Sequence, residues 1–389
     1  MKKNLQNERA AAVQRFLCGE NPKAVCASFS RSRRWLYKWV ARHSPDDPAW
    51  CESRSRKPLI SPQRTPAEIE DIVEMVRLRL YNKELFCGDQ AIRWELEDMN
   101  VQPLPSLSTI SRILRRRDLT HRRTGRYEPK GKAYPALPSR LPNQTHQADL
   151  VGPCYLIGPI RFYSLNSIDT AINRCAIEPM PSQAAQSVLD AVYAVWKRMG
   201  IPDNLQVDNE MAFYGSPTHP RGMGPLIRLC LLYGVHLWFI PPAEPWRNGV
   251  VERFNDHYRQ KFLAKVQMTS MIQLRQKSLA QEKKHNSTYR YSKLKGQTPL
   301  TSLARMKPKL VFPDQKQAPR HPLEKPKEGR YHLVRFIRSD RRLNIFGEIF
   351  TAPLETQYEY VVATIDVKEQ RLKLFLDKIQ VEEYQYRLR

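Results

Sequence analysis

The chain has 389 residues, too many for one compact core, and this length indicates two to four domains. Its 64 Lys and Arg against 39 Asp and Glu give a formal net charge of +25, which favours a polyanionic partner, above all nucleic acid. A hydrophobic share of 41% argues against wholesale disorder, and there is neither a membrane-spanning apolar run nor an apolar signal-peptide core. We therefore expect a soluble, cytoplasmic, nucleoid-associated protein without a membrane partner.

Residues 1–45 have the pattern of three short helices, with a stop and a restart at Gly19-Glu20-Asn21-Pro22. In the third helix Leu36, Trp39 and Val40 share one face. The other positions are basic and include the candidate DNA-reading residues Arg31, Arg33, Arg34 and Lys38. Two helices, a tight turn and a basic third helix predict a helix-turn-helix domain that enters the major groove. The alternative is an amphipathic helix whose charges are merely solvated.

A Pro- and Ser-rich stretch, 46–65, is interpreted as a linker. Residues 66–119 again show three helical stripes, and we interpret them as a second helix-turn-helix unit. Its last helix buries Ile110, Ile113 and Leu114 and points basic side chains outward. The candidate DNA-binding residues there are Arg112, Arg115 and Arg116. Residues 120–142, rich in Lys, Arg and Pro, are expected to be an extended basic linker suited to DNA phosphates.

In residues 143–306 the sequence pattern changes from helical stripes to three alternating strands, followed by helix, strand, helix, strand and helix. This order predicts a mixed α/β sheet covered by helices. A second Pro/Lys-rich linker, 307–329, leads to short alternating strands in 330–389, which predict a small β-barrel. The basic residues of that last domain favour contact with DNA without sequence reading, and a protein–protein module is the alternative.

Three carboxylates follow strand ends in the central domain. Asp149 ends its first strand, Asp208 ends its fourth, and Glu252 begins the helix after its fifth. Loops at strand ends are where α/β sheets assemble sites, and gathered carboxylates repel one another unless cations neutralise them. Carboxylate oxygens suit Mg²⁺ or Mn²⁺, and a pair of such ions about 3.5–4 Å apart clamps an in-line displacement at phosphorus. Taken alone, Glu252 is better explained as an ordinary first-turn Glu favoured by the helix dipole.

The segments HQADLVG, LQVDNEMAFYGS and PPAEPWRNGVVERFN together resemble the three blocks of the retroviral-integrase-type core of bacterial insertion-sequence transposases. The resemblance covers roughly residues 143–306. It implies an RNase H-like fold and makes Asp149, Asp208 and Glu252 the acidic triad that binds Mg²⁺ or Mn²⁺, expected as two ions. Helix-turn-helix units stand where retroviral integrases carry a His/Cys zinc module.

The function expected on this basis is a DDE-type transposase that cleaves DNA strands and transfers them at the ends of a mobile element. Its partners would be double-stranded DNA and further copies of the chain, and whether an accessory ATPase is required stays open. The alternatives are a non-catalytic DNA-binding regulator or target-site protein that keeps the fold, and a simple nuclease of the same fold. The intact triad argues against the first. The additional DNA-binding regions argue against the second.

Overall fold

The computed structural model describes residues 2–47, 49–53, 65–120, 133–215, 219 and 221–389. The chain divides into two compact units, Met1–Arg64 and Thr65–Arg389. Of the predicted linkers, residues 48 and 54–64 of the first and 121–132 of the second lie outside the described residues. Within the described part of the chain, no helix is both long and apolar enough to span a membrane.

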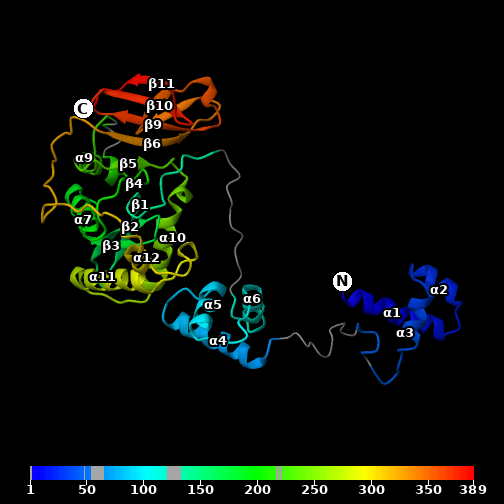
Figure 1. Cartoon of the computed structure of the whole chain (residues 1–389). Helices are drawn as coiled ribbons and strands as arrows, with labels where there is room; N and C mark the ends of the chain where they lie inside the picture. Colours follow the sequence, from blue (N-terminus) through cyan, green and yellow to red (C-terminus); the bar gives the residue numbers. More distant parts are fainter. Residues whose placement is uncertain (1, 48, 54–64, 121–132, 216–218, 220) are drawn as a thin grey trace. The chain divides into compact units, whose positions relative to one another are not determined.

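The first unit is built from three helices, as the sequence predicts (Figure 1). These are α1 (Lys2–Leu17), α2 (Pro22–Ser28) and α3 (Arg33–Val40). The two short helices begin at capping residues: the Asn21 side chain accepts a hydrogen bond from the Lys23 N–H, and Ser32 accepts one from the Trp35 N–H. Apolar residues of all three helices meet in one small core that includes Ala12, Val25 and Leu36.

The second unit begins with a further three-helix module. Its helices are α4 (Ala67–Asn82), α5 (Asp89–Asp98) and α6 (Leu107–Arg116). Val73, Ile92 and Ile110, one from each helix, are fully buried in a shared core. Ser106 caps α6 by accepting a hydrogen bond from the Thr109 N–H. We call residues 65–119 the second helical module.

A mixed sheet covered by helices follows, in the predicted order. Its strands are β1 (Thr145–Tyr155), β2 (Arg161–Asp169), β3 (Cys175–Met180), β4 (Asn204–Val207) and β5 (His236–Phe239). The main helices are α7 (Ala185–Met199), α8 (Met211–Tyr214), α9 (Pro225–Leu232), α10 (Gly249–Tyr258), α11 (Met271–Thr288) and α12 (Pro299–Met306). Short irregular helices are η1 (Pro245–Asn248), η2 (Arg259–Leu263) and η3 (Ser292–Leu294). Strands β1, β2 and β3 form an antiparallel meander, and β4 and β5 run parallel to β1.

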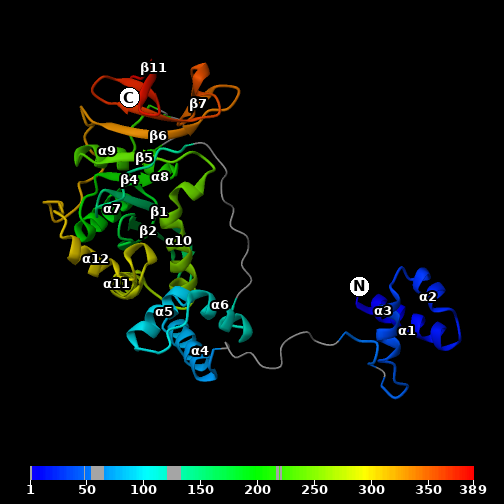
Figure 2. The ribbon, with the colours of Figure 1, turned by 45° about the vertical axis from the view of Figure 1, so that its right-hand side comes forward.

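The two faces of this sheet are covered by different helices. Ala148 and Leu150 of β1 pack with α7 and α9, whereas the alternating Val151 packs with α10. Figures 1 and 2 agree in placing α7 and α10 on opposite sides of β1 and β2. The side chains of β1 that alternate with Ala148 and Leu150 therefore face α10, which is where Asp149 belongs.

The C-terminal strands are present as predicted, but they do not stand apart as a separate barrel. They are β6 (Arg330–Phe336), β7 (Arg342–Ile345), β8 (Glu348–Thr351), β9 (Tyr360–Asp366), β10 (Arg371–Leu376) and β11 (Ile379–Gln385), with η4 (Leu354–Thr356) before β9. Strand β6 pairs in parallel with β5, so the sheet continues in the order β11-β10-β9-β6-β5-β4-β1-β2-β3. A single apolar core includes residues of both the central and the C-terminal strands, among them Leu150 of β1 and Leu374 of β10. Pairing with β6 covers the open edge of β5, which would otherwise leave backbone groups unpaired.

The segment 307–329, predicted to be a linker, is fastened to the core. The Tyr193 hydroxyl donates a hydrogen bond to the Gln315 carbonyl at 2.7 Å, and the Lys197 ammonium donates one to the Lys316 carbonyl at 2.8 Å. Leu323 is buried in the main core. The segment therefore lies along α7, and it does not act as a free tether that would let the C-terminal strands reposition.

Candidate active site and nucleic-acid interface

Strand register brings two of the three predicted acids together. Gln147 of β1 and Gln206 of β4 are direct partners in the parallel ladder. Asp149 and Asp208 each follow two residues later, so they project from the same face of neighbouring strands. That face is the one covered by α10, the helix whose first turn carries Glu252.

The start of α10 is hydrogen-bonded to the strands that carry the aspartates. The Gln147 side-chain oxygen accepts from the N–H groups of Val250 at 3.0 Å and Val251 at 3.2 Å. The Gln206 side-chain amide donates to the Arg247 carbonyl at 2.8 Å. Asn248 occupies the N-cap position, but its buried side chain donates to the Ala148 carbonyl and does not cap the helix. Gln147 supplies the cap instead, a role that its position two residues before Asp149 could have signalled.

A chain of buried amides holds Asp149 from the other side. The Asn255 amide, one turn after Glu252 on α10, donates to Asp149 Oδ2 at 2.7 Å. Asn166 of β2 donates to Asn255 Oδ1 at 2.7 Å, and Ser164 donates to Asn166 Oδ1 at 2.8 Å. Sequence reasoning missed Asn255 and Asn166, although Asn255 lies one turn from Glu252 and Asn166 is opposite Asp149 in the β1–β2 ladder.

The acids are partly desolvated and repel one another. Burial raises the pKa of Asp149, and the Asn255 hydrogen bond opposes the rise. Burial and the Asp149 charge raise the pKa of Asp208 to about 6. Burial raises the pKa of Glu252, with repulsion from Asp149, Asp256 and Asp208 adding to it. The structure thus brings the three predicted acids within electrostatic reach of each other at one edge of α10.

Glu210 is a fourth carboxylate beside the site. Burial and the Asp208 charge raise the pKa of Glu210 to about 7. The Gln183 amide donates to Glu210 Oε1 at 2.8 Å, and the Glu210 N–H donates to Asp208 Oδ1 at 3.2 Å. Glu210 therefore combines a place in the loop, at the start of α8, with electrostatic coupling to the acids.

Strands β6 and β9 fasten the two loops that carry Asp208 and Glu252. Arg335 is 5% exposed, and its guanidinium donates to Asn209 Oδ1 at 2.9 Å and to the Ile240 carbonyl at 3.2 Å. Tyr360 donates its hydroxyl hydrogen to Glu244, which pairs with Arg247 at 3.0 Å. Among the basic C-terminal residues expected to face DNA, Arg335 is thus a buried structural group.

The donor set fits a hard divalent cation, because it consists of carboxylates that repel one another without one. Within the described part of the chain, however, no three His, Cys, Asp or Glu side chains converge as a ready-made metal cage. Mg²⁺ does not require one, since it is commonly held by one or two carboxylates and completes its shell with water and substrate phosphate.

Two domain families match this sequence. Residues 233–299, which include Glu252 and Asn255, match the integrase core domain. Residues 7–48 match the homeodomain-like domain. By the first match, residues 233–299 are similar to part of an integrase-type core. The homeodomain-like match covers most of α1 and all of α2 and α3, and it confirms the prediction of an N-terminal helix-turn-helix domain.

Among solved structures, the integrase-type core is similar to retroviral integrases at low identity. The HTLV-2 integrase catalytic core domain in complex with magnesium is 18% identical, with 41% of this chain and 96% of that chain covered and a TM-score of 0.32. The catalytic core domain of BIV integrase is 15% identical, with 42% and 96% covered and a TM-score of 0.32. A simian T-cell lymphotropic virus intasome in complex with PP2A regulatory subunit B56 gamma is 14% identical, with 80% and 96% covered and a TM-score of 0.37.

The predicted DNA-reading residues of α3 are mostly available. Arg33, Arg34 and Lys38 are exposed, and Arg34 and Lys38 lie on the side of α3 away from the buried Leu36. Arg31 lies just before the helix and pairs with Glu8 at 3.1 Å, so it is partly committed within the domain. The exposed set is where a homeodomain-like domain presents base-reading side chains.

In the second helical module the three arginines predicted to bind DNA make different contacts. Arg115 is exposed at the C-terminal end of α6, and Arg112 is exposed but donates to the Ser108 carbonyl of its own helix. Arg116 pairs with the buried Glu70 of α4 at 2.6 Å. Arg116 therefore links α6 to α4, and of the three predicted contacts it is the least available to DNA.

Proposed function

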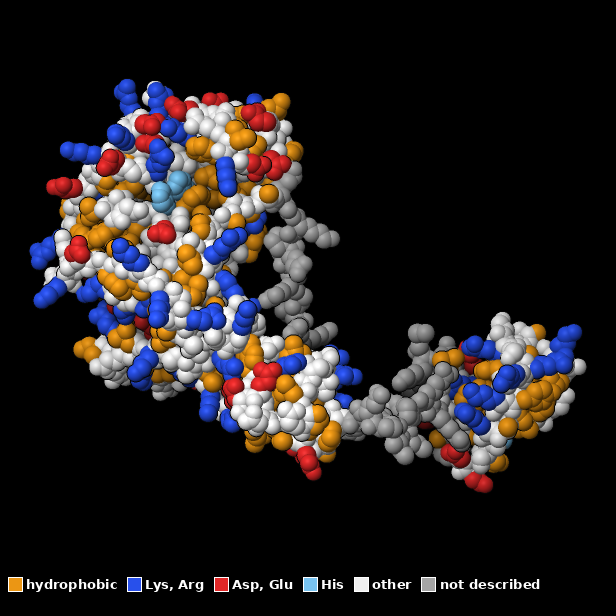
Figure 3. Space-filling model, in the orientation of Figure 1, with side chains coloured by type: hydrophobic (Ala, Val, Ile, Leu, Met, Phe, Trp, Pro, Cys, Tyr) orange, Lys and Arg blue, Asp and Glu red, His pale blue; other side chains and the backbone are white. Residues whose placement is uncertain are grey.

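We propose that this protein is a transposase that cleaves DNA strands and transfers them at the ends of a mobile element, using divalent metal ions. The observation that carries the proposal is that Asp149, Asp208 and Glu252 lie close enough to repel one another, although they are far apart in the sequence. Their repulsion marks a site that favours cations. Lys and Arg side chains spread over the surface seen in Figure 3 are consistent with a DNA partner.

Asp149, Asp208 and Glu252 would hold Mg²⁺ or Mn²⁺, expected as two ions. Bound there, the ions would stabilise the charge that develops at phosphorus and activate water or a 3′-hydroxyl as the nucleophile. The chain's own amides set the geometry: Asn255 orients the Asp149 carboxylate, and Gln147 fixes the turn that carries Glu252. The homeodomain-like domain would select the DNA through Arg33, Arg34 and Lys38. Assembly of several copies on DNA is part of the proposal, whereas an accessory ATPase has no support in the comparisons.

The test is loss of chemistry without loss of binding. Asp149→Asn, Asp208→Asn and Glu252→Gln should each reduce Mg²⁺-dependent cleavage of end DNA by about three orders of magnitude, because each removes a negative ligand. Affinity for the same DNA should stay near the wild-type value, since Lys and Arg supply it. Asp203→Asn, an exposed carboxylate at the opposite end of β4, is the matched control and should cleave normally.

Substantial cleavage by one of the three variants would remove that residue from the site. A wild-type protein that binds end DNA with high specificity but never cleaves it, with either Mg²⁺ or Mn²⁺, would instead support the non-catalytic DNA-binding alternative.

A further inference from the structure

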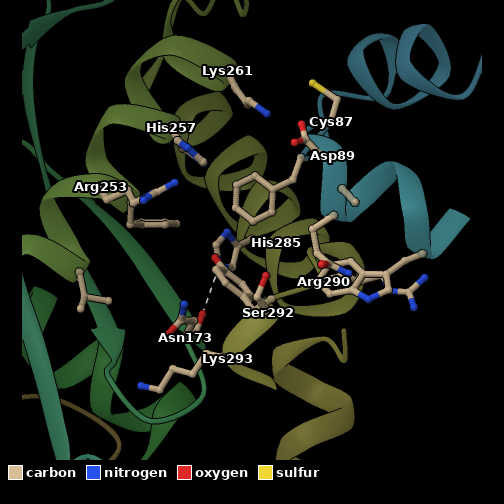
Figure 4. A pocket seen from close by; sticks show the side chains of 18 of the residues that line it. Cys87, Asp89, Asn173, Arg253, His257, Lys261, His285, Arg290, Ser292 and Lys293 are labelled. Atoms are coloured by element: carbon tan, nitrogen blue, oxygen red, sulfur yellow. Dashed lines mark hydrogen bonds between the residues drawn. The ribbon is translucent and has the colours of Figure 1, made fainter. Parts of the chain in front are cut away.

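A cavity of about 830 Å³ lies between the second helical module and the integrase-type core (Figure 4). One wall is the loop from Phe86 to Asp89 with the first turn of α5. The opposite wall is α10, and the segment after α11 closes the end. The module is docked firmly at this place: the Lys261 ammonium donates to the Glu84 and Leu85 carbonyls, and Lys284 pairs with Glu84 at 2.9 Å.

Four cations line the cavity, and most of them lack a carboxylate partner. Lys261 donates only to the two carbonyls just described, and Lys293 donates to the Thr170 carbonyl. Arg253 is exposed and makes no hydrogen bond or ion pair with any residue that the structure describes. Only Arg290 is paired, with Asp98 at 2.6 Å. Among the described residues, Arg253, Lys261 and Lys293 therefore have no carboxylate in ion-pair contact, although Glu84 and Asp169 act on the two lysines from a greater distance.

Burial makes that charge unfavourable in the absence of an anion. It lowers the pKa of Lys261 and the pKa of Lys293, which is the expected effect of partly removing an ammonium group from water when no carboxylate contacts it. Burial also lowers the pKa of His257 and of His285 to about 4, so both histidines are neutral near pH 7. One carboxylate, Asp89, lines the cavity and accepts a hydrogen bond from Ser111.

The walls favour a phosphate over a base as the ligand. A stacked base needs a free aromatic face, but Phe86 already makes edge contacts with His257, Tyr289 and Tyr291. The Trp94 ring is covered by Arg290 at 5.1 Å. What remains available is charge, at Arg253, Lys261 and Lys293.

The cavity also connects to the candidate active site through α10. Arg253, His257 and Lys261 are four residues apart, and Figure 4 shows them on successive turns facing the loop of the second helical module. Gly249 and Val250, the first residues of α10, line the same cavity, and Glu252 follows in the same turn. A phosphate backbone held along this wall of the cavity would therefore lie close to the first turn of α10, which carries Glu252.

We propose that this cavity binds the sugar–phosphate backbone of duplex DNA through Arg253, Lys293 and Lys261, and guides it toward the candidate active site. The proposal rests on the proposed function, since it places the DNA of that reaction. It also gives the docked second helical module a role other than reading bases: the module forms one wall of the phosphate-binding cavity.

The experiment is a salt titration of DNA binding by the full chain, with a random-sequence duplex as the probe. Arg253→Gln and Lys293→Gln should each lower affinity about tenfold near 0.1 M salt, and should make the slope of log affinity against log salt shallower by about 0.9, because each removes one phosphate contact. Arg253→Lys keeps the charge and should retain the wild-type slope. Lys283→Gln on α11, an exposed lysine that does not line the cavity, is the matched control and should also retain it.

Slopes of Arg253→Gln and Lys293→Gln equal to that of Lys283→Gln would overturn the inference and leave the proposed function intact. Failure of the wild-type chain to bind any duplex would refute the proposed function itself. A parallel titration with tripolyphosphate separates the sources of phosphate. Tripolyphosphate binding that both variants abolish, together with unchanged DNA slopes, would make a free polyphosphate the ligand and would overturn the assignment to DNA.

Discussion

Replacing Gln147 with Ala should loosen the first turn of α10, the turn that carries Glu252. In the folded protein the Gln147 side-chain oxygen accepts from the N–H groups of Val250 and Val251. Gln147 is 7% exposed and Val251 is fully buried, so water does not readily take over these bonds. The substitution would leave two N–H groups at a helix start without their acceptor.

The free-energy cost of Gln147→Ala follows from the loss of these two hydrogen bonds. Removing a helix cap costs about 0.5–2 kcal/mol, and a buried donor left unsatisfied costs about 1–3 kcal/mol. Because the small side chain leaves room for partial hydration, we expect about 2–3 kcal/mol, which is roughly a 30- to 150-fold increase in local opening. Gln206→Ala is the matched control. It removes one donor from the Arg247 carbonyl, which keeps a second one from Gln147 at 3.4 Å, and should cost about 0.5–1.5 kcal/mol.

Native-state hydrogen exchange of the Val250 and Val251 amides measures this directly. Exchange at both amides should accelerate in Gln147→Ala by the factor given above and by less than about tenfold in Gln206→Ala. Cleavage should fall in the same order, since Glu252 moves with the turn. Unchanged exchange at Val250 and Val251 in Gln147→Ala, or equal acceleration in both variants, would refute the capping role of Gln147.

Two further predictions concern contacts made by other parts of the chain. Glu84→Gln should destabilise the second unit by about 0.5–1 kcal/mol at neutral pH. The hydrogen bond from Lys284 is the main reason that the pKa of Glu84 is lowered from 4.5. The stabilisation is therefore present above pH 4.5 and is lost as the pH falls through the folded pKa. A wild-type–variant difference in unfolding free energy that does not shrink as the pH is lowered below 4.5 would contradict this. Arg335→Lys should slow single-turnover cleavage of saturated DNA about tenfold or more, because lysine leaves some of the carbonyl and amide oxygens without donors. Reduced DNA affinity with an unchanged cleavage rate would count against it, and the exposed Arg338→Lys is the control.

The parts of the fold that could be predicted are those that depend on the local periodicity of apolar and polar residues. The alternation in β1 assigns Ala148 and Leu150 to one face and Asp149 to the other, and a helical stripe places Val251 and Phe254 toward the sheet. The order of strands and helices in the core follows from such patterns. The register Gln147–Gln206 then needs only parallel neighbours to bring Asp149 beside Asp208.

What could not be predicted depends on contacts between distant parts of the chain. Alternation identifies β6 as a strand but does not reveal which sheet edge it joins, so the expected separate barrel and the observed extension of the central sheet have the same local signature. The pairing of Arg335 with Asn209 and of Arg116 with Glu70 likewise has no local signal. Arginine is the residue type expected at DNA contacts, and only the tertiary structure shows that Arg335 and Arg116 bind other parts of the protein instead.

The way in which the acids are held supports their proposed use. Among the described residues, no salt bridge involves Asp149, Asp208 or Glu252, and Arg259 lowers the pKa of Asp149 only through space. Lysine or arginine in direct contact would have been the simplest way to stabilise buried carboxylates, but such a cation would compete with a divalent ion for the same oxygens. The contacts come instead from neutral donors: the Asn255 amide on Asp149 and the Glu210 N–H on Asp208, while the Gln183 amide holds the neighbouring Glu210. Neutral donors position the carboxylates and leave their charge available, which is what a cation-binding site requires.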